Sequence, residues 1–153
     1  MTKPDLDMDK AHRYFAVECN NKAWDLIEGP SLDPEGAERL VHLAHTSVFH
    51  WSHAGDELNA LRGETLLVAA YLKARRPEPA SHHGVISFRM LEQSKGRHTL
   101  FDAAMAHTLV AGAHRLAGRS EEASLCSERA ASLLDQLESA GERDLIVSLE
   151  KLA

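Results

Sequence analysis

The segment from Leu40 to Gly55 concentrates the side chains with the clearest capacity for chemistry. It contains four of the chain's ten histidines, at positions 42, 45, 50 and 53. Imidazole nitrogens bind transition metals and also act as general acids or bases near neutral pH. Written as a helix, the segment places His50 and His53 in one row, and Glu57 extends this row if the helix continues through Gly55. His50, His53 and Glu57 are therefore candidate ligands for a divalent cation such as zinc, iron or nickel.

Helical geometry limits this metal site. His42 and His53 are eleven residues apart, about 16 Å along a helix axis, and cannot share one ion. Three ligands on one helix usually need a fourth from another element. The candidates for it are His82, His83 and His107. Gly55 has the context of a helix C-cap, and a break there would remove Glu57 from the row. The alternative interpretation is that these histidines form the polar parts of a helix packed on both sides by other helices.

Other catalytic signatures are sparse. A histidine general base needs an oriented partner, and His50 with Arg62 or Asp102 is one conceivable arrangement. The sequence contains no glycine-rich phosphate loop, no Gly-x-Ser-x-Gly and no Cys-x-x-Cys. We therefore expect a non-catalytic protein without a cofactor, with a divalent transition metal as the alternative.

Composition indicates one globular domain in a reducing compartment. The chain has 153 residues, with 44% hydrophobic and 26% charged residues. Its net charge of -6 argues against a nucleic-acid partner. Cys19 and Cys126 lie inside apolar helical patterns and are expected to be small buried hydrophobes. The N-terminus lacks the apolar run of a signal peptide, and no apolar stretch is long enough to span a membrane. We expect a cytoplasmic protein.

Glycine and proline divide the chain into seven helices. The expected helices cover about residues 6–28, 34–54, 56–75, 79–95, 99–118, 120–139 and 142–152. Asp33-Pro34 illustrates a helix start, with aspartate as N-cap and proline at the first helical position. No stretch alternates with period two for long enough to form a strand. The sequence predicts an all-α fold.

Rows of small and apolar residues recur every 43 positions. The aligned sets are Ala37, Ala80 and Ala123, then Ala44, Ser87 and Ala130, and then Val48, Leu91 and Leu134. Small residues seven apart lie on one helix face and let two helix axes approach closely. The repeat predicts antiparallel hairpins over about residues 6–54, 56–95 and 99–139, stacked in a right-handed array similar to tetratricopeptide repeats. A capping helix at 142–152 is expected to cover the apolar face of the last hairpin.

Several segments also resemble a known family. These include Ala44-His45-Thr46-Ser47 followed by His50-Trp51, then Arg62-Gly63-Glu64, Glu78-Pro79-Ala80 and Phe101-Asp102-Ala103-Ala104. They are similar to a family of short bacterial helical-repeat proteins, related to tetratricopeptide repeats, with an AHxSxxHW motif. The resemblance covers about Leu40 to the C-terminus and implies a helical-repeat fold without a known activity.

These patterns lead to two functional hypotheses. The first is a non-catalytic helical-repeat protein that binds a protein or peptide in a groove between stacked hairpins, or that pairs with itself. Expected groove contacts are His45, His50, Asn59, Arg62 and Asp102. Phe49 points away from the core face of its helix and is a candidate for a homodimer interface. The second is a metal-binding bundle that uses His50, His53 and Glu57, with a sensing or enzymatic role.

Overall fold

The computed structural model describes residues 4–153, and every regular element in this range is helical, as the sequence predicts. The elements are α1 (Met8–Glu28), α2 (Pro34–Ala54), α3 (Glu57–Lys73), α4 (Pro77–Gln93), α5 (Leu100–Leu116), α6 (Ser120–Asp135), α7 (Ala140–Ser148) and a 3-10 turn, η1 (Leu149–Leu152). No helix in the described range is long and apolar enough to cross a membrane.

Most helix starts are fixed by local capping. The Asp33 side chain accepts a hydrogen bond from the Gly36 amide, and Pro34 occupies the first turn of α2. Asp56 and Thr99 each form a capping box with the residue three positions later. Such side-chain acceptors satisfy amides that have no partner within the helix, so these boundaries can be read from sequence.

The turns that follow α3 and α5 have the same backbone conformation. Arg75 and Gly118 both have positive φ, at 60° and 77°. Arg76 N–H donates to the Tyr71 carbonyl, as Arg119 N–H does to His114. This is a Schellman C-cap, placed twice with a spacing of 43 residues. The turns within the second and third hairpins therefore have the same conformation. The first hairpin differs, because α1 ends at Gly29 with an extended backbone.

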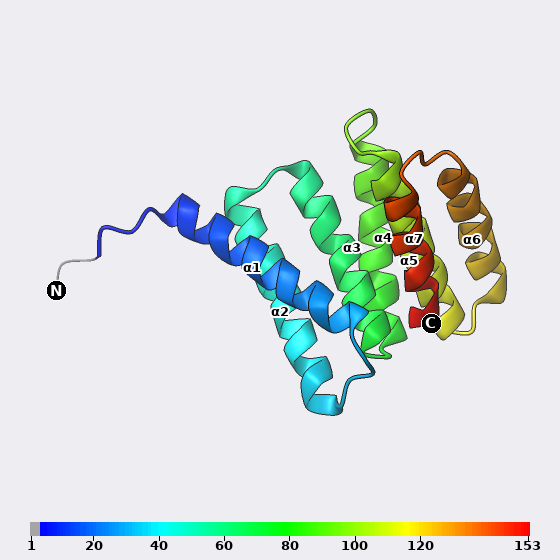
Figure 1. Cartoon of the computed structure of the whole chain (residues 1–153), viewed down its shortest axis with the longest axis horizontal. Coiled ribbons are helices and arrows are strands. Elements are labelled where there is room, and N and C mark those ends of the chain that lie inside the picture. The colour runs from blue at the N-terminus through cyan, green and yellow to red at the C-terminus, as the bar shows by residue number, and fades with distance from the viewer. Residues whose placement is uncertain (1–3) are drawn as a thin grey trace.

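Neighbouring helices pack in pairs, and the pairs stack (Figure 1). The extensive contacts are between α1 and α2, α3 and α4, and α5 and α6. Helix α3 also contacts α1 and α5, so the three hairpins form one continuous row. This arrangement is compatible with a tetratricopeptide-like array. The core lies along α3 and α5, where Leu66, Val68 and Leu109 are fully buried or nearly so.

Small residues permit the close approach of the helices. Ala44, Ser87 and Ala130, one of the rows found in the repeat, are all buried. In the first hairpin the buried Ser47 hydroxyl donates to the Ala16 carbonyl at 2.8 Å and thereby ties α2 to α1. Burying a hydroxyl at a helix contact requires such a partner.

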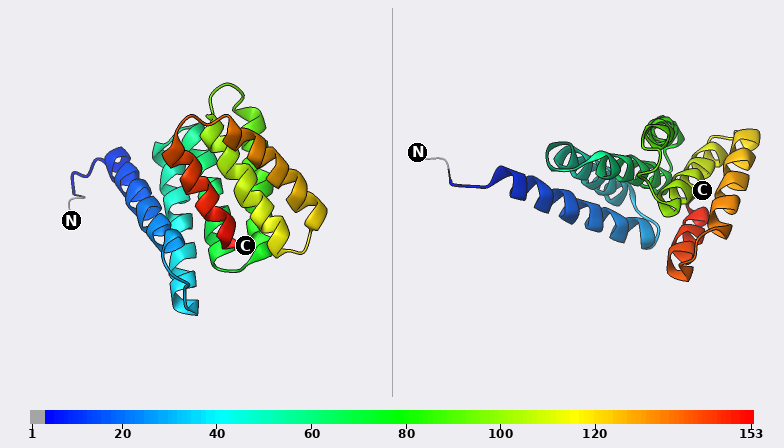
Figure 2. Two further views of the ribbon diagram at one scale, coloured as in Figure 1. Left: turned by 45° about the vertical axis from the view of Figure 1, so that its right-hand side comes forward. Right: turned by 90° about the horizontal axis from the view of Figure 1, so that it is seen from above.

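The C-terminal segment lies against the first helices of the hairpins. Helix α7 contacts α5, and η1 contacts both α5 and α3 (Figure 2). The Ala153 side chain lies 3.3 Å from where a Cβ on Gly112 would be. The expected cap over the last hairpin thus packs mainly on α5 and reaches back to α3. Leu145 of α7 thereby forms part of the wall of the hollow described next.

Candidate functional site

A hollow of about 250 Å³ opens between the first helices of the three hairpins. Its lining residues are Asn20, Trp24 and Glu28 of α1, Leu61, Arg62 and Thr65 of α3, Phe101, Asp102 and Met105 of α5, and Leu145 of α7. On α1 the residues recur every four positions, which places them on one helix face. Four elements therefore contribute to one surface, with apolar walls and a few polar groups.

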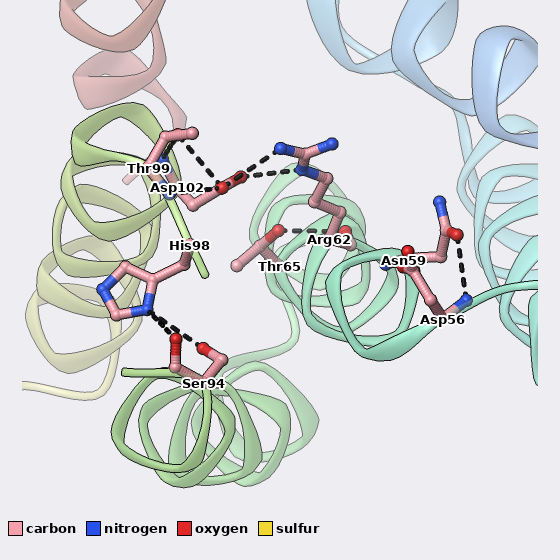
Figure 3. A network of polar contacts seen from close by, with 8 residues as sticks. All are labelled: Asp56, Asn59, Arg62, Thr65, Ser94, His98, Thr99 and Asp102. Carbon is pink, nitrogen blue, oxygen red and sulfur yellow. Dashed lines mark hydrogen bonds and ion pairs between the residues drawn. The ribbon is translucent and has the colours of Figure 1, made fainter. Parts of the chain in front are cut away.

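The buried carboxylate of Asp102 orients the Arg62 side chain, which lines the hollow (Figure 3). Arg62 donates from Nε to Asp102 Oδ1 at 2.8 Å and from Nη2 to Oδ2 at 3.1 Å. The Asp102 side chain is 2% exposed, whereas that of Arg62 is 52% exposed. This two-bond geometry fixes the plane of the guanidinium, and the Nη1 group remains for a bound partner.

The same carboxylate caps α5. Asp102 Oδ2 accepts hydrogen bonds from the Thr99 amide and hydroxyl, both at 3.0 Å. Burial by itself raises the pKa of Asp102, but the hydrogen bonds from Arg62 and Thr99 outweigh it and hold the pKa below its ordinary value. Asp102 is therefore a fixed anion, and Arg62 is oriented before any ligand arrives.

The five residues predicted for the groove are divided by the fold. Arg62 and Asp102 line the hollow. The Asn59 side chain accepts from the Asp56 amide in the capping box of α3 and does not line the hollow. His45 and His50 lie on α2, the second helix of its hairpin, and are also outside the hollow. His45 and His50 are therefore outside the hollow because α2 is a second helix, and Asn59 because its side chain caps α3.

His45 belongs to a separate polar network across α2, α3 and α4. Its Nε2 lies 2.8 Å from the Tyr71 hydroxyl, and its ring centroid is 5.6 Å from that of His83. His83 in turn places Nδ1 2.7 Å from a Glu64 carboxylate oxygen. Burial lowers the pKa of His45, and the neighbouring His83 lowers it further. These contacts join the first hairpin to the second.

The predicted metal triad is not brought together. Helix α2 ends at Ala54, and Glu57 begins α3 with its carboxylate 2.7 Å from Arg97 Nη1. Within residues 4–153, no group of three or more His, Cys, Asp or Glu side chains is arranged to hold a metal ion. The Gly55 break expected from sequence is therefore the reason that Glu57 leaves the row of His50 and His53.

The histidine partner of His50 comes from α1, and the sequence did not indicate it. His12 Nδ1 lies 2.8 Å from His50 Nδ1, and the His12 ring stacks on that of His53 with centroids 4.4 Å apart. His50 does not pair with Arg62 or Asp102, which bind each other, so the conceivable general-base arrangement is not formed. Burial lowers the pKa of His50, and His12 and His53 add to this effect.

The expected fourth ligands have other contacts. His83 is paired with Glu64, and His82 lies beside His83 with ring centroids 5.1 Å apart. His107 packs on Phe88 of α4, with ring centroids 4.6 Å apart.

Phe49, the candidate for a homodimer interface, is 56% exposed, as its position opposite the core face of α2 predicts.

The fold and the hollow together define an all-helical protein with a preformed concave surface. The sequence matches no model of a known protein family, and searches of curated proteins and of solved structures found no match either. The resemblance to bacterial helical-repeat proteins therefore stays a prediction.

Proposed function

We propose that this protein is non-catalytic and binds a peptide segment of a partner protein in the hollow between α1, α3, α5 and α7. The observation that carries the proposal is an oriented, half-exposed Arg62 among apolar walls that include Trp24 and Phe101. Apolar walls with a few fixed polar groups are the usual composition of a recognition site. Such a site requires no reacting group from the protein.

The size and chemistry of the hollow favour a peptide side chain as its occupant. Small-molecule and cofactor sites usually enclose about 300–1,000 Å³, and this hollow measures about 250 Å³ and is open to solvent. An apolar side chain between Trp24 and Met105 would bury its surface there. A neighbouring carbonyl or carboxylate oxygen would accept a hydrogen bond from Arg62 Nη1, because Nε and Nη2 are used by Asp102.

Selection from a phage-displayed peptide library on the immobilised protein tests this proposal. We expect enriched peptides that share an apolar residue beside an oxygen-bearing group. Their affinity should fall at least tenfold with Trp24→Ala, because aromatic anchors dominate binding energy. Leu125→Ala is the matched control, since Leu125 is 67% exposed on α6, outside the hollow.

Arg62→Lys separates recognition by the guanidinium from apolar contact alone. Lysine keeps the charge but cannot form the two-bond contact with Asp102. We expect the selected peptides to bind this variant several-fold more weakly. No enrichment by the wild-type protein, or enriched peptides that bind Trp24→Ala as tightly as the wild type, would exclude the hollow as the binding site.

Self-association is the second candidate, and the exposed aromatic side chains of the first hairpin support it. Phe49 is 56% exposed and Phe15 is 48% exposed, and both contact the His50 ring. Sedimentation velocity on the wild-type chain and on Phe49→Ser tests it. We expect a dimer that the substitution dissociates. A weak dimer has a Kd on the order of 100 µM. A wild-type chain that stays monomeric at this concentration would eliminate this candidate.

A further inference from the structure

Three imidazoles from two helices meet at the outer edge of the first hairpin. His12 of α1 contacts both His50 and His53 of α2, with ring centroids 5.0 Å and 4.4 Å away. We call these three residues the imidazole cluster. It lies outside the hollow between the first helices and has no role in the proposed peptide binding.

Hydrogen bonding indicates where the lone pairs of the cluster lie. The His53 Nδ1 is 3.0 Å from the Phe49 carbonyl, which can only accept, so Nδ1 carries the proton and Nε2 has a free lone pair. His12 and His50 face each other through Nδ1 atoms 2.8 Å apart, so in the neutral pair one nitrogen donates and the other accepts.

The separation of these two nitrogens is close to that of two ligands on one ion. Metal–nitrogen bonds of about 2.0–2.1 Å place adjacent ligand nitrogens about 3.0–3.4 Å apart, depending on geometry. The pair at 2.8 Å would widen by a few tenths of an ångström. As the rings now lie, His53 is parallel to His12 within 9°, so the three lone pairs do not converge. This agrees with the lack of a ready three-ligand group among residues 4–153.

We infer that the imidazole cluster binds a divalent transition metal ion such as Zn²⁺ or Ni²⁺. His12 and His50 are the primary ligands through Nδ1. His53 completes the site by turning its exposed ring, which exchanges the hydrogen bond to the Phe49 carbonyl for a bond to the metal. Rotation of an exposed side chain between staggered conformations is fast and inexpensive. Water would occupy the remaining positions of the ion.

The surroundings favour a cation and give it access. His50 and His53 lie in the last turns of α2, which ends at Ala54, where the helix dipole is negative. His53 also lines an open surface hollow of about 400 Å³ together with Asp9, through which an ion can enter. Two cations, Lys10 and Arg13, line the same hollow, but Lys10 pairs with Asp7, and Arg13 lies over the Trp51 ring.

Calorimetric titration of the full, tag-free chain with zinc chloride or nickel chloride tests the inference. We expect one ion per chain and a rise in melting temperature, because an ion that binds the folded state stabilises it. His12→Ala and His50→Ala should each weaken binding at least tenfold, and His53→Ala less. His12→Phe keeps an aromatic ring against His53 but removes both nitrogens, so it separates loss of the ligand from loss of packing.

The control variants are His42→Ala and His82→Ala, which remove exposed histidines outside the cluster. They should bind the ion like the wild type. Binding that survives His12→Ala or His12→Phe, or no binding at 100 µM metal, on the order of a weak-site Kd, would overturn the inference. Trp24→Ala should leave metal binding unchanged, so failure here is distinguishable from failure of the peptide-binding proposal.

Discussion

Arg75 and Gly118 occupy the same left-handed position of the same turn in two successive hairpins. Their φ angles are 60° and 77°, and equivalent backbone hydrogen bonds surround them. Glycine adopts this conformation without steric cost, whereas a residue with a Cβ atom is disfavoured by about 1 kcal/mol or more. The second hairpin therefore carries strain that the third avoids.

Arg75→Gly should stabilise the protein by about 1 kcal/mol, because it removes the steric cost of the left-handed residue. The reverse change at the equivalent position, Gly118→Ala, should destabilise it by a similar amount. Urea unfolding at constant m-value measures both. Arg39→Gly in the second turn of α2 is the control and should lower stability by about 1 kcal/mol through helix propensity. Equal losses for Arg75→Gly and Arg39→Gly would contradict the role assigned to the turn.

Ala130→Leu should destabilise the chain by about 1–3 kcal/mol, because the added side chain overfills a close helix contact. Ala130 is 4% exposed and belongs to the row of small residues shared by the three hairpins. The adjacent Ala131 is exposed, so Ala131→Leu is a control with the same chemical change. Thermal melts of both variants give the comparison. Similar melting temperatures for the two would show that the row is not a packing constraint.

Asp102→Asn should destabilise the protein by about 1–3 kcal/mol, because Arg62 loses its charged partner and the cap of α5 is weakened. The pKa of Asp102 is lowered in the folded state, so its contribution is complete above the unfolded pKa of about 4. This contribution is lost as pH falls through the folded pKa. The stability difference between wild type and variant should therefore shrink below about pH 4. Urea midpoints from pH 7 to pH 3 measure it.

Asp144→Asn on the exposed side of α7 is the matched control for this series. It should cost under about 0.5 kcal/mol, as substitutions at exposed sites usually do. A difference between wild type and Asp102→Asn that grows toward low pH would refute the assigned direction of the Asp102 pKa.

His107→Leu should make the protein more resistant to mild acid. Burial lowers the pKa of His107, and the nearby Arg129 lowers it further. Above the unfolded pKa of about 6.5 the imidazole is neutral in both states, and below it the unfolded chain binds the proton more readily. Wild-type stability should therefore fall between about pH 7 and pH 5, and this loss should be smaller in His107→Leu.

The buried Nδ1 of His107 has no hydrogen-bond partner among residues 4–153. The leucine variant should for this reason also be more stable at pH 7, by about 1 kcal/mol. Arg129→Gln tests the electrostatic contribution, since it should raise the pKa of His107 toward its ordinary value and weaken the acid sensitivity. Parallel acid titrations of wild type and both variants, followed by circular dichroism, show whether His107 and Arg129 cause the acid sensitivity.

The sequence predicted the helices well because their ends are set by neighbouring residues. Asp33 with Pro34, and the capping boxes at Asp56 and Thr99, act within one helical turn. Several other helix ends differ by two to four residues from the expected positions, including the starts of α1 and α7, which Asp7 and Ser139 cap. Helix α4 begins at Pro77 instead of Pro79, and α6 ends at Asp135 instead of about residue 139.

The candidate site was only partly predictable. Arg62 and Asp102 were selected as polar residues on first helices, and they do line the hollow. Trp24 and Phe101 were missed, because both fit an ordinary core pattern in sequence. His12 was missed as well, because 38 residues separate it from His50.

The sequence by itself determined the all-α class, most helix boundaries and the break at Gly55, since capping and turn formation depend on residues a few positions apart. The tertiary structure decided which faces meet. It placed α7 and η1 against α5, turned His45 and His50 away from the hollow, and joined His12 to His50. Such contacts depend on how helices dock over long separations in the chain, and helical periodicity identifies an apolar face without specifying its partner.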